Sequence, residues 1–393
     1  MYIQRDLAKT FKEALRAFPS VIITGPRQSG KTTFVQNELK TADYVSFDDP
    51  TERDFARHDP KGFLKRFKKK KVVIDEIQYV AEIIHYIKLD IEQARHRYGR
   101  WVLTGSQQFI LMKEISESLA GRVGVLELLP FCTKEALSAR KINLEQILWY
   151  GLYPEITLKP AKRDLWVRSY VRTYLERDVR QLMNIKDLRV FEEFVSLLAA
   201  QHAQVFNHSA LARDVGVSVP TIKSWVGVLE ASYIIYFLRP YFKNYGKRII
   251  KSPKMYFLDP ALVSLLTRQP SMEAAVAGAM GGALFEGFIV SEAVKAYLNS
   301  GKSPDIFYWR SHDGLEVDLI LQTKGKLLPV EIKLSSTPAT GHVNTLERFK
   351  KTAGKDAFQQ GIVVCRVDKK TPLPHDNLAL PWWEFYGFVK RLI

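Results

Sequence analysis

The sequence has few cysteines and no long hydrophobic run. Its two cysteines, Cys132 and Cys365, lie far apart and form no CxxC pair, and no histidine–cysteine cluster has zinc-site spacing. This pattern excludes a disulfide scaffold and predicts buried thiols in a reducing compartment. The first residues lack an apolar signal core, and no window reaches the ~18 uncharged apolar residues of a membrane span. We therefore expect a cytoplasmic protein with no membrane partner.

Low-complexity tracts are also missing, and the composition is that of a globular protein. The chain has 393 residues, of which 46% are hydrophobic and 25% charged, enough for two or three domains that each have a core. The formal net charge is +16. A basic balance of this size favours an anionic macromolecular partner, most plausibly nucleic acid, although it also suits a protein that the charge only keeps in solution.

A glycine-rich loop between a strand and a helix is the strongest motif. The β-branched run at 21–23 predicts a buried strand, and helical spacing resumes at Thr32. The loop has the form G-x-x-x-x-G-K-T, whose backbone amides surround phosphate oxygens while a helix N-terminus faces the anion. Lys31 is expected to reach the β- and γ-phosphates of ATP, and the Thr32 hydroxyl to bind Mg²⁺. The predicted nucleotide-binding residues are Gly25, Pro26, Arg27, Gln28, Ser29, Gly30, Lys31, Thr32 and Thr33.

A second strand pattern ends in two acids. Residues 72–74 are Val, Val and Ile, and Asp75 and Glu76 follow directly. Acids at the tip of a buried strand downstream of a P-loop are typical of the Walker B motif. Asp75 is predicted to hold Mg²⁺, directly or through water, and Glu76 to orient and deprotonate the attacking water. The alternative is a strand that merely ends in a charged loop.

Two further positions resemble those of AAA-type ATPases. Residues 101–104 predict a strand, and a polar side chain at its tip would link the Walker B acid to the γ-phosphate. Thr104 or Ser106 fits this role, although Ser106 also suits the N-cap of a following helix. Arg122 stands where such cores carry an arginine finger that acts on a neighbouring subunit of a homo-oligomer. A plain surface arginine is the alternative.

Residues 1–145 thus alternate strands with helices. The alternation predicts an α/β fold, a parallel sheet covered by helices on both faces, with nucleotide at the carboxyl ends of the strands. The basic segment at 65–71 most simply forms a solvated face.

The next predicted region, residues 146–265, begins with helices. Residues 165–183 predict a helix that carries aromatic and charged side chains together. We interpret it as a lid or linker on the ATPase core, in which one of the arginines is a candidate nucleotide sensor.

A helix-turn-helix pattern occupies residues 209–230. Ala212 is small where two helices would cross, Gly216 suits the turn, and Ser218 suits the cap of the second helix. Lys223 on that second helix is expected to contact the DNA backbone.

Two apolar runs, at 234–238 and 254–258, follow the helix-turn-helix pattern and predict a hairpin, the wing of a winged helix. The segment between them is basic and aromatic, which favours contact with DNA. The alternative is a winged helix that docks a protein. The charged and aromatic residues are Arg239, Lys243, Lys247, Arg248 and Lys251, with Tyr241, Phe242 and Tyr245.

The last region, residues 266–393, predicts a nuclease-like site. Asp318 opens one predicted strand, and the next carries Glu331 and Lys333, which point to the same face because they are two residues apart. This is the PD-(D/E)XK pattern, in which Asp318 and Glu331 bind Mg²⁺ and Lys333 activates water and stabilises the phosphorane charge. Glu286, in a preceding helix, is the usual fourth member. The same fold also serves as a catalytically inert binding module.

Several of these stretches together resemble a widespread prokaryotic family of uncharacterised ATP-binding proteins. Members join an AAA-type core to a winged helix and a PD-(D/E)XK nuclease-like tail, and the resemblance spans almost the whole chain. It implies ATP binding and the handling of nucleic acid. A Leu at 152 replaces the usual second Gly of a Gly-Gly-Tyr-Pro-Glu turn, without evident functional consequence. The matching stretches are residues 24–33, 75–78, 103–106, 119–122 and 331–333.

Two functions follow from this pattern. The first is a Mg²⁺-dependent ATPase that binds DNA and couples ATP hydrolysis to DNA handling, with a C-terminal domain that binds or cleaves DNA. The second is a nucleotide-gated regulatory or scaffold protein, whose winged helix docks a protein and whose tail is inert. Both require ATP, so the P-loop does not separate them.

Overall fold

The computed structural model describes residues 2–67, 71–106, 115, 117–173, 187–242 and 252–393. The contacts divide the chain into two compact units, each treated separately below. The first comprises residues 1–131 with 231–233 and 298–302, and the second comprises the remainder. Residues 132–145, which the sequence assigned to the first domain, thus group with the second unit. The domain boundaries after residues 145 and 265 stay predictions.

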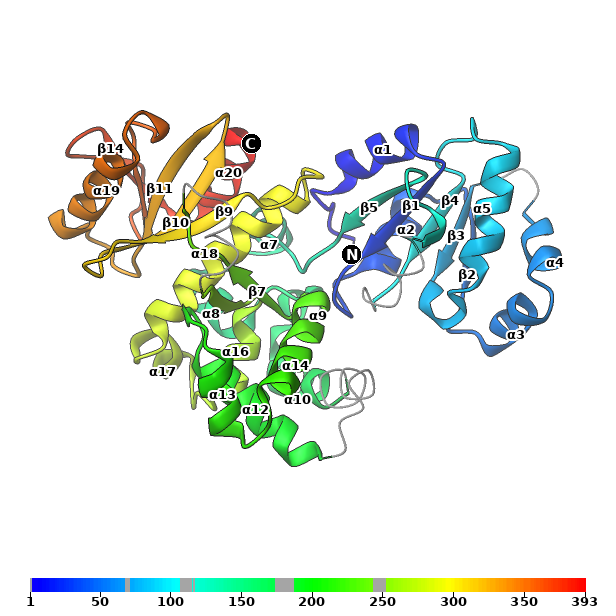
Figure 1. Cartoon of the computed structure of the whole chain (residues 1–393), viewed down its shortest axis with the longest axis horizontal. Coiled ribbons are helices and arrows are strands. Elements are labelled where there is room, and N and C mark those ends of the chain that lie inside the picture. The colour runs from blue at the N-terminus through cyan, green and yellow to red at the C-terminus, as the bar shows by residue number, and fades with distance from the viewer. Residues whose placement is uncertain (1, 68–70, 107–114, 116, 174–186, 243–251) are drawn as a thin grey trace. The chain divides into compact units, whose positions relative to one another are not determined.

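The first unit contains a five-stranded parallel sheet in the order β2-β3-β4-β1-β5 (Figure 1). The predicted strands are all present, and the sheet has helices on both faces as expected. The strands are β1 (Ser20–Thr24), β2 (Asp43–Ser46), β3 (Val72–Asp75), β4 (Trp101–Thr104) and β5 (Val123–Glu127). The helices are α1 (Ala8–Ala17), α2 (Lys31–Glu38), α3 (Pro50–His58), α4 (Pro60–Lys65), the 3₁₀ turn η1 (Ile77–Val80) and α5 (Ile83–Gln93).

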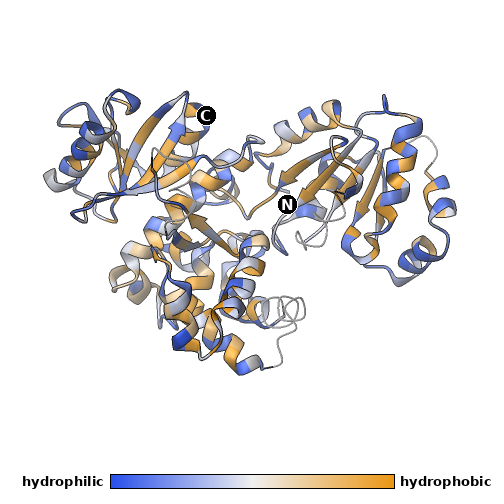
Figure 2. Ribbon diagram, viewed as in Figure 1, coloured by the Kyte–Doolittle hydropathy of each residue, from blue (hydrophilic) through white to orange (hydrophobic). Residues whose placement is uncertain are grey.

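Alternating strand residues build a separate core on each face of this sheet. Ile22 and Ile74 belong to the core beneath α3, α4 and α5, whereas Val21 and Val73 belong to the core beneath α1 and α2. This two-sided burial explains why the strands are apolar throughout and appear orange in Figure 2.

The second unit begins with helices and a small antiparallel sheet. The order is helix, short strand, two helices and two strands over residues 188–257, and the strands pair as β6-β8-β7. The elements are α7 (Thr133–Ala139), α8 (Leu144–Tyr150), α9 (Pro154–Leu158), η2 (Pro160–Lys162), α10 (Arg163–Tyr170), α12 (Leu188–Ala200), β6 (Gln204–Val205), α13 (His208–Val215), α14 (Val219–Ala231), β7 (Ile235–Leu238), β8 (Lys254–Phe257), α16 (Pro260–Leu266) and α17 (Met272–Ala277).

The same unit ends in a six-stranded mixed sheet of order β13-β14-β12-β11-β10-β9. Strands β9, β10 and β11 are antiparallel, whereas β11, β12 and β14 run parallel. The buried helix that carries Glu286 precedes the sheet, as predicted. The elements are α18 (Gly281–Leu298), β9 (Ile306–Arg310), β10 (Glu316–Thr323), β11 (Lys326–Ile332), α19 (Thr340–Ala353), η4 (Gly354–Asp356), β12 (Ile362–Cys365), β13 (Thr371–Leu373), β14 (Asn377–Pro381), η5 (Trp382–Glu384) and α20 (Phe385–Leu392).

The segment after β7 extends the mixed sheet at its β9 edge. Tyr241 N donates to Tyr308 O at 2.6 Å, and Tyr308 N donates to Arg239 O at 3.0 Å. The Tyr241 ring also packs edge-on against Phe307, with centroids 5.7 Å apart. The first residues of the predicted wing therefore pair with the tail of the chain. The predicted wing residues 243–251 lie outside the described residues, as do residues 174–183 of the predicted lid helix.

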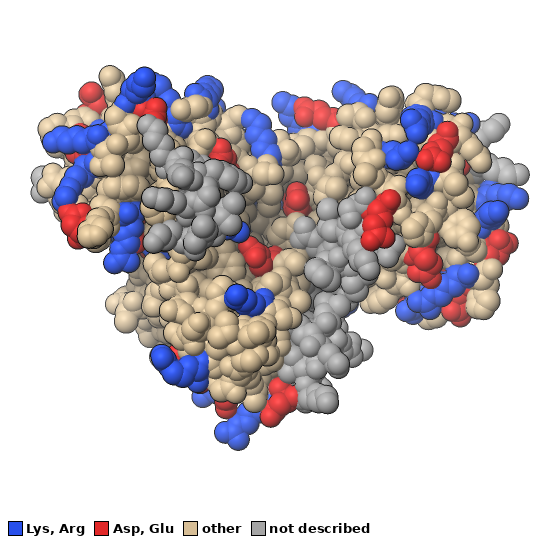
Figure 3. Space-filling model, viewed as in Figure 1, with Lys and Arg blue, Asp and Glu red and all other residues tan. Residues whose placement is uncertain are grey.

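Both cysteines, Cys132 and Cys365, are buried, as the sequence predicts, and form no disulfide. Within the described ranges, none of the helices is both long and apolar enough to cross a bilayer. On the face shown in Figure 3, Lys and Arg side chains are spread over each of the two units.

Candidate functional site

The P-loop begins directly after β1 with Gly25, a position where any other residue would be strained. Gly25 has a φ of +143°, and a Cβ atom there would lie 2.2 Å from the carbonyl oxygen of Leu128. At the other end Gly30, with a φ of +95°, is the N-cap of α2. Both conformations favour glycine. The loop therefore places the amino terminus of α2 at the carboxyl end of β1, where an anion is favoured.

Lys31 lies buried inside this loop. Its Nζ donates to Gly25 O at 3.0 Å and to Pro26 O at 2.9 Å. Burial lowers the pKa of Lys31 to about 8, although the Glu76 and Asp75 carboxylates oppose the shift. Phosphate oxygens would supply the negative charge that a buried ammonium group needs.

The remaining predicted P-loop residues differ in burial. Ser29 is buried, and its Oγ has no hydrogen-bond partner among the described residues, so it is available to a ligand. Arg27 is partly buried, whereas Gln28, with a φ of +61°, and Thr33 are exposed. Buried donors, small loop residues and a helix N-terminus together fit a nucleotide phosphate chain.

Arg5 supports the loop, a role that the sequence did not predict. Its Nη1 donates to Ser29 O at 2.8 Å and its Nη2 to Leu129 O at 2.6 Å. The buried guanidinium thus links the P-loop to the segment after β5. A lone arginine near the amino terminus carries no sequence signal for such a contact.

Asp75 at the end of β3 is the centre of a hydroxyl cluster. The Thr32 Oγ1 and the Tyr44 hydroxyl both donate to Asp75 Oδ2 at 2.7 Å, and Thr104 Oγ1 contacts Oδ1. Carboxylate and hydroxyl oxygens are the ligands that Mg²⁺ prefers, so the predicted metal-binding pair Thr32 and Asp75 fits this ion. Tyr44 was not predicted. Burial and the neighbouring Asp75 raise the pKa of the Tyr44 hydroxyl, which keeps it a donor.

Glu76 lies beside the predicted sensor residues. Its backbone is left-handed, with a φ of +54°, and its N–H donates to Thr104 Oγ1 at 3.3 Å. Ser106 Oγ donates to Glu76 Oε2 at 3.4 Å, and the Gln78 amide contacts the same oxygen. Thr104 therefore contacts both acids and Ser106 only the second, a division of roles that the sequence left open.

Arg122 lies at the amino end of the strands, whereas the P-loop lies at their carboxyl end. Its carbonyl oxygen accepts from Ser20 N, at the start of β1, and the loop follows Thr24 four residues later. Four residues of strand span roughly 13 Å. The Arg122 side chain is held by Glu92 Oε1, 3.0 Å from its Nη2. Arg122 is thus placed away from its own chain's P-loop.

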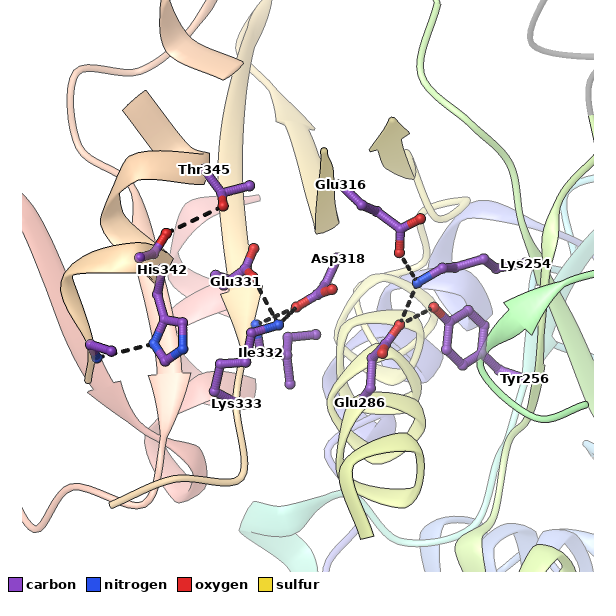
Figure 4. Close-up of polar contacts among 12 residues, drawn as sticks. Lys254, Tyr256, Glu286, Glu316, Asp318, Glu331, Ile332, Lys333, His342 and Thr345 are labelled. Carbon is purple, nitrogen blue, oxygen red and sulfur yellow. Dashed lines mark hydrogen bonds and ion pairs between the residues drawn. The ribbon is translucent and has the colours of Figure 1, made fainter. Parts of the chain in front are cut away.

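A second polar cluster forms in the second unit and unites the four predicted nuclease residues (Figure 4). Lys333 Nζ lies 3.0 Å from Asp318 Oδ2 and 2.8 Å from Glu331 Oε1. Ile332 N also donates to Asp318 Oδ2, at 2.8 Å. Glu286 lies close enough to interact electrostatically with Asp318. The four residues named from the sequence pattern therefore lie in one cluster.

A β-bulge positions Asp318. In β10, Val317 pairs with Trp309 and Ile320 with Phe307, so that β10 has one more residue than β9 over this stretch. Bulges redirect side chains and are common beside functional sites. The bulge was not visible in the sequence, because no glycine or proline marks it.

Burial dominates the electrostatics of Glu331. It raises the pKa of Glu331 to about 8, with a further contribution from Asp318, while Lys333 opposes the shift. The side chain is 6% exposed, and its Oε2 has no hydrogen-bond partner in the described part of the chain. A buried carboxylate oxygen without a partner fits a cation ligand.

Three members of the cluster were not predicted: Lys254, Tyr256 and Glu316. Lys254 Nζ lies 2.9 Å from Glu286 Oε1 and also contacts Glu316. The Tyr256 hydroxyl donates to the same Glu286 oxygen at 2.6 Å. Burial lowers the pKa of Lys254, but the two glutamates outweigh this effect and hold it above its usual value.

The two lysines separate the carboxylates of this cluster. Over residues 2–67, 71–106, 115, 117–173, 187–242 and 252–393, no group of three Asp, Glu, His or Cys side chains converges on a common metal position. The carboxylates instead face Lys254 on one side and Lys333 on the other (Figure 4). A cation would therefore have to replace an ammonium group.

Comparison with known proteins divides the chain into three matched regions. Residues 17–137 match the AAA domain family. Residues 141–273 and 281–385 match two domains of unknown function, DUF8612 and DUF4143. The AAA match covers the parallel sheet from just before β1 to beyond β5, including the P-loop, and so agrees with the fold described above.

Relatives extend over most of the chain. Uncharacterized proteins of Mycobacterium tuberculosis and Mycobacterium bovis are each 32% identical over 340 residues, which cover 86% of this chain and 75% of each relative. Among solved structures, a Walker-type ATPase of Pyrococcus abyssi is 12% identical, with a TM-score of 0.45, and the similarity covers 68% of this chain and 96% of that one. The chain belongs to the protein family of these mycobacterial relatives, and its first unit has the AAA-type ATPase fold.

Proposed function

We propose that the protein is a Mg²⁺-dependent ATPase that acts on DNA. The observation that carries the ATPase proposal is that Lys31, Thr32, Asp75 and Glu76 meet at the carboxyl edge of the parallel sheet. Lys31 would hold the phosphates, and Thr32 and Asp75 would hold Mg²⁺, which when bound offsets the phosphate charge. Glu76, with its carboxylate beside Ser106, would orient water and accept its proton.

The position of Arg122 supports a homo-oligomer. Its side chain is paired with Glu92 at the amino end of the strands, away from the P-loop of its own chain. We propose that it stabilises the transition state in the site of a neighbouring copy.

The DNA-binding proposal rests on the helix-turn-helix of the second unit. Gly216 has a φ of +77° and ends α13, and Ser218 Oγ accepts from Thr221 N at 3.2 Å at the start of α14. The flanking α12, β6, β7 and β8 occur in the order of a winged helix. Lys223 is exposed on α14 and free to meet a phosphate.

The salt dependence of DNA binding tests this proposal. Replacing Lys223 with alanine should weaken binding to all duplex sequences alike and reduce the slope of log K against log salt by about 1, because one phosphate contact is lost. Fluorescence anisotropy over a salt series measures the slope. Lys9→Ala, the same charge change on an exposed face of α1, should leave it unchanged. A wild-type slope near zero would favour the nucleotide-gated regulatory protein instead.

We further propose that the tail is a Mg²⁺-dependent nuclease. The topology of α18, three antiparallel strands, α19 and a parallel strand, with Asp318, Glu331 and Lys333 together, supports this proposal. Asp318 and Glu331 would hold Mg²⁺, whose charge polarises a phosphate when bound. Lys333 would orient the attacking water, and Glu286 would complete the constellation.

Nicking of supercoiled plasmid in Mg²⁺ measures this activity. It should disappear in Asp318→Ala and Lys333→Ala, a fall of at least ~10²-fold, since each removes a group that contacts metal or water. Asp313→Ala removes an exposed acid from the turn between β9 and β10 and serves as the matched control. If wild-type protein cleaves neither supercoiled plasmid nor linear, branched or single-stranded DNA, the tail is an inert module.

An ATPase assay with added DNA tests whether hydrolysis in the first unit is coupled to DNA binding in the second. ATP turnover should rise when linear, branched or single-stranded DNA is added, if hydrolysis is coupled to DNA handling. Equal rates of ATP turnover with and without each form of DNA would contradict the coupling to DNA but leave the ATPase proposal standing.

A further inference from the structure

The two lysines of the carboxylate cluster differ in their access to water. The Lys333 side chain is 35% exposed, whereas that of Lys254 is 6% exposed. The Lys333 ammonium group can therefore turn into water, whereas the buried Lys254 has no such route. Asp318 and Glu331, whose side chains are 8% and 6% exposed, would then need another cation to compensate their charge.

Lys254 is held in place by strand pairing of its backbone and by two ion pairs of its side chain. It opens β8, which is paired with β6 and β7, and its Nζ contacts Glu286 Oε1 and Glu316 Oε1. Tyr256, two residues along the same strand, donates to the same Glu286 oxygen. A cation that belongs to the fold thus offsets part of the negative charge of Glu286 and Glu316.

The other two carboxylates form a buried pair that we call open, because their lysine can move into water. Asp318 and Glu331 face the movable Lys333, and Glu331 Oε2 is buried without a hydrogen-bond partner among the described residues. This unpartnered oxygen marks the side of the cluster that can accept a cation ligand.

We propose that Lys254 is a built-in cation that keeps divalent ions off Glu286 and Glu316, so that the tail binds a single ion, at Asp318 and Glu331. The inference rests on the metal-dependent tail proposed above. It gives Glu286 a different role from the predicted fourth member of the constellation, because Glu286 holds Lys254 and leaves the metal to the open pair.

Counting bound Mn²⁺ by electron paramagnetic resonance tests the proposal without using activity. The full chain is titrated without nucleotide and in an Asp75→Asn background, so that the first unit contributes no ion. One ion should bind per chain, none after Asp318→Asn, and still one after Glu286→Gln. Lys254→Ala should bind two, because removing the ammonium group frees Glu286 and Glu316 and leaves space for an ion.

The outcomes separate the two proposals. No bound Mn²⁺ in the parent protein overturns the metal-dependent tail, and this inference with it. One ion in the parent but a loss of Mn²⁺ in Glu286→Gln overturns the role of Lys254 alone, and this result does not depend on whether Lys254→Ala folds. A folded Lys254→Ala protein, checked by its thermal melt, that still binds one ion also overturns it.

Discussion

Replacing Lys31 with alanine should abolish ATP turnover, with a fall of at least ~10³-fold. Its ammonium group is the charge that the P-loop holds in its interior, within 3.0 Å of the loop carbonyls. Its loss removes stabilisation from phosphate oxygens in a buried site, where electrostatic effects are largest. Phosphate release measures the rate, and a fluorescent ATP analogue measures binding.

A matched control separates this effect from a general loss of charge. Lys40 is exposed just beyond α2, so Lys40→Ala should keep wild-type turnover. Wild-type turnover in Lys31→Ala would end the assignment of this loop as the ATP site.

Replacing Glu76 with glutamine should leave ATP bound but lower its hydrolysis by about 10²–10⁴-fold. Glutamine has the same shape and can keep the contact with Ser106, yet it cannot accept a proton from water. The left-handed backbone at this position is retained, because the change leaves the main chain untouched. Single-turnover hydrolysis together with equilibrium binding of labelled ATP distinguishes the two steps.

Glu82→Gln, at the start of α5, is the matched control and should hydrolyse ATP at the wild-type rate. If Glu76→Gln instead loses ATP affinity, the acid supports the structure of the site and is not its base.

Much of the first unit could be predicted because its signals are local. Each strand is an apolar run that ends at a polar tip, and parallel strands bring these tips to one edge. Lys31, Asp75 and Thr104 therefore came together as expected. Tyr44 and Arg5 could not be predicted, since their roles depend on which strand lies beside β3 and on where the amino terminus crosses the P-loop.

The tail shows the limit of the same reasoning. Glu331 and Lys333 share a face by strand periodicity, and their partner Asp318 lies on the adjacent strand. Lys254, however, enters from a strand of another sheet, more than sixty residues before Asp318 in the chain. Only the tertiary structure brings Lys254 into the cluster, so neither strand periodicity nor motif spacing could predict its position there.

The pairing of residues 239–241 with β9 has a practical consequence for expression. Strand β9 forms one border of the six-stranded sheet, and these residues occupy its open hydrogen-bonding groups, while the Tyr308 hydroxyl donates to Ser252 O at 2.8 Å. A fragment that begins at α18 would expose this border and leave Glu286 and Glu316 without their lysine. Uncovered sheet borders promote aggregation. Truncated proteins for biochemistry should therefore start near residue 132 and keep the helical region with the tail.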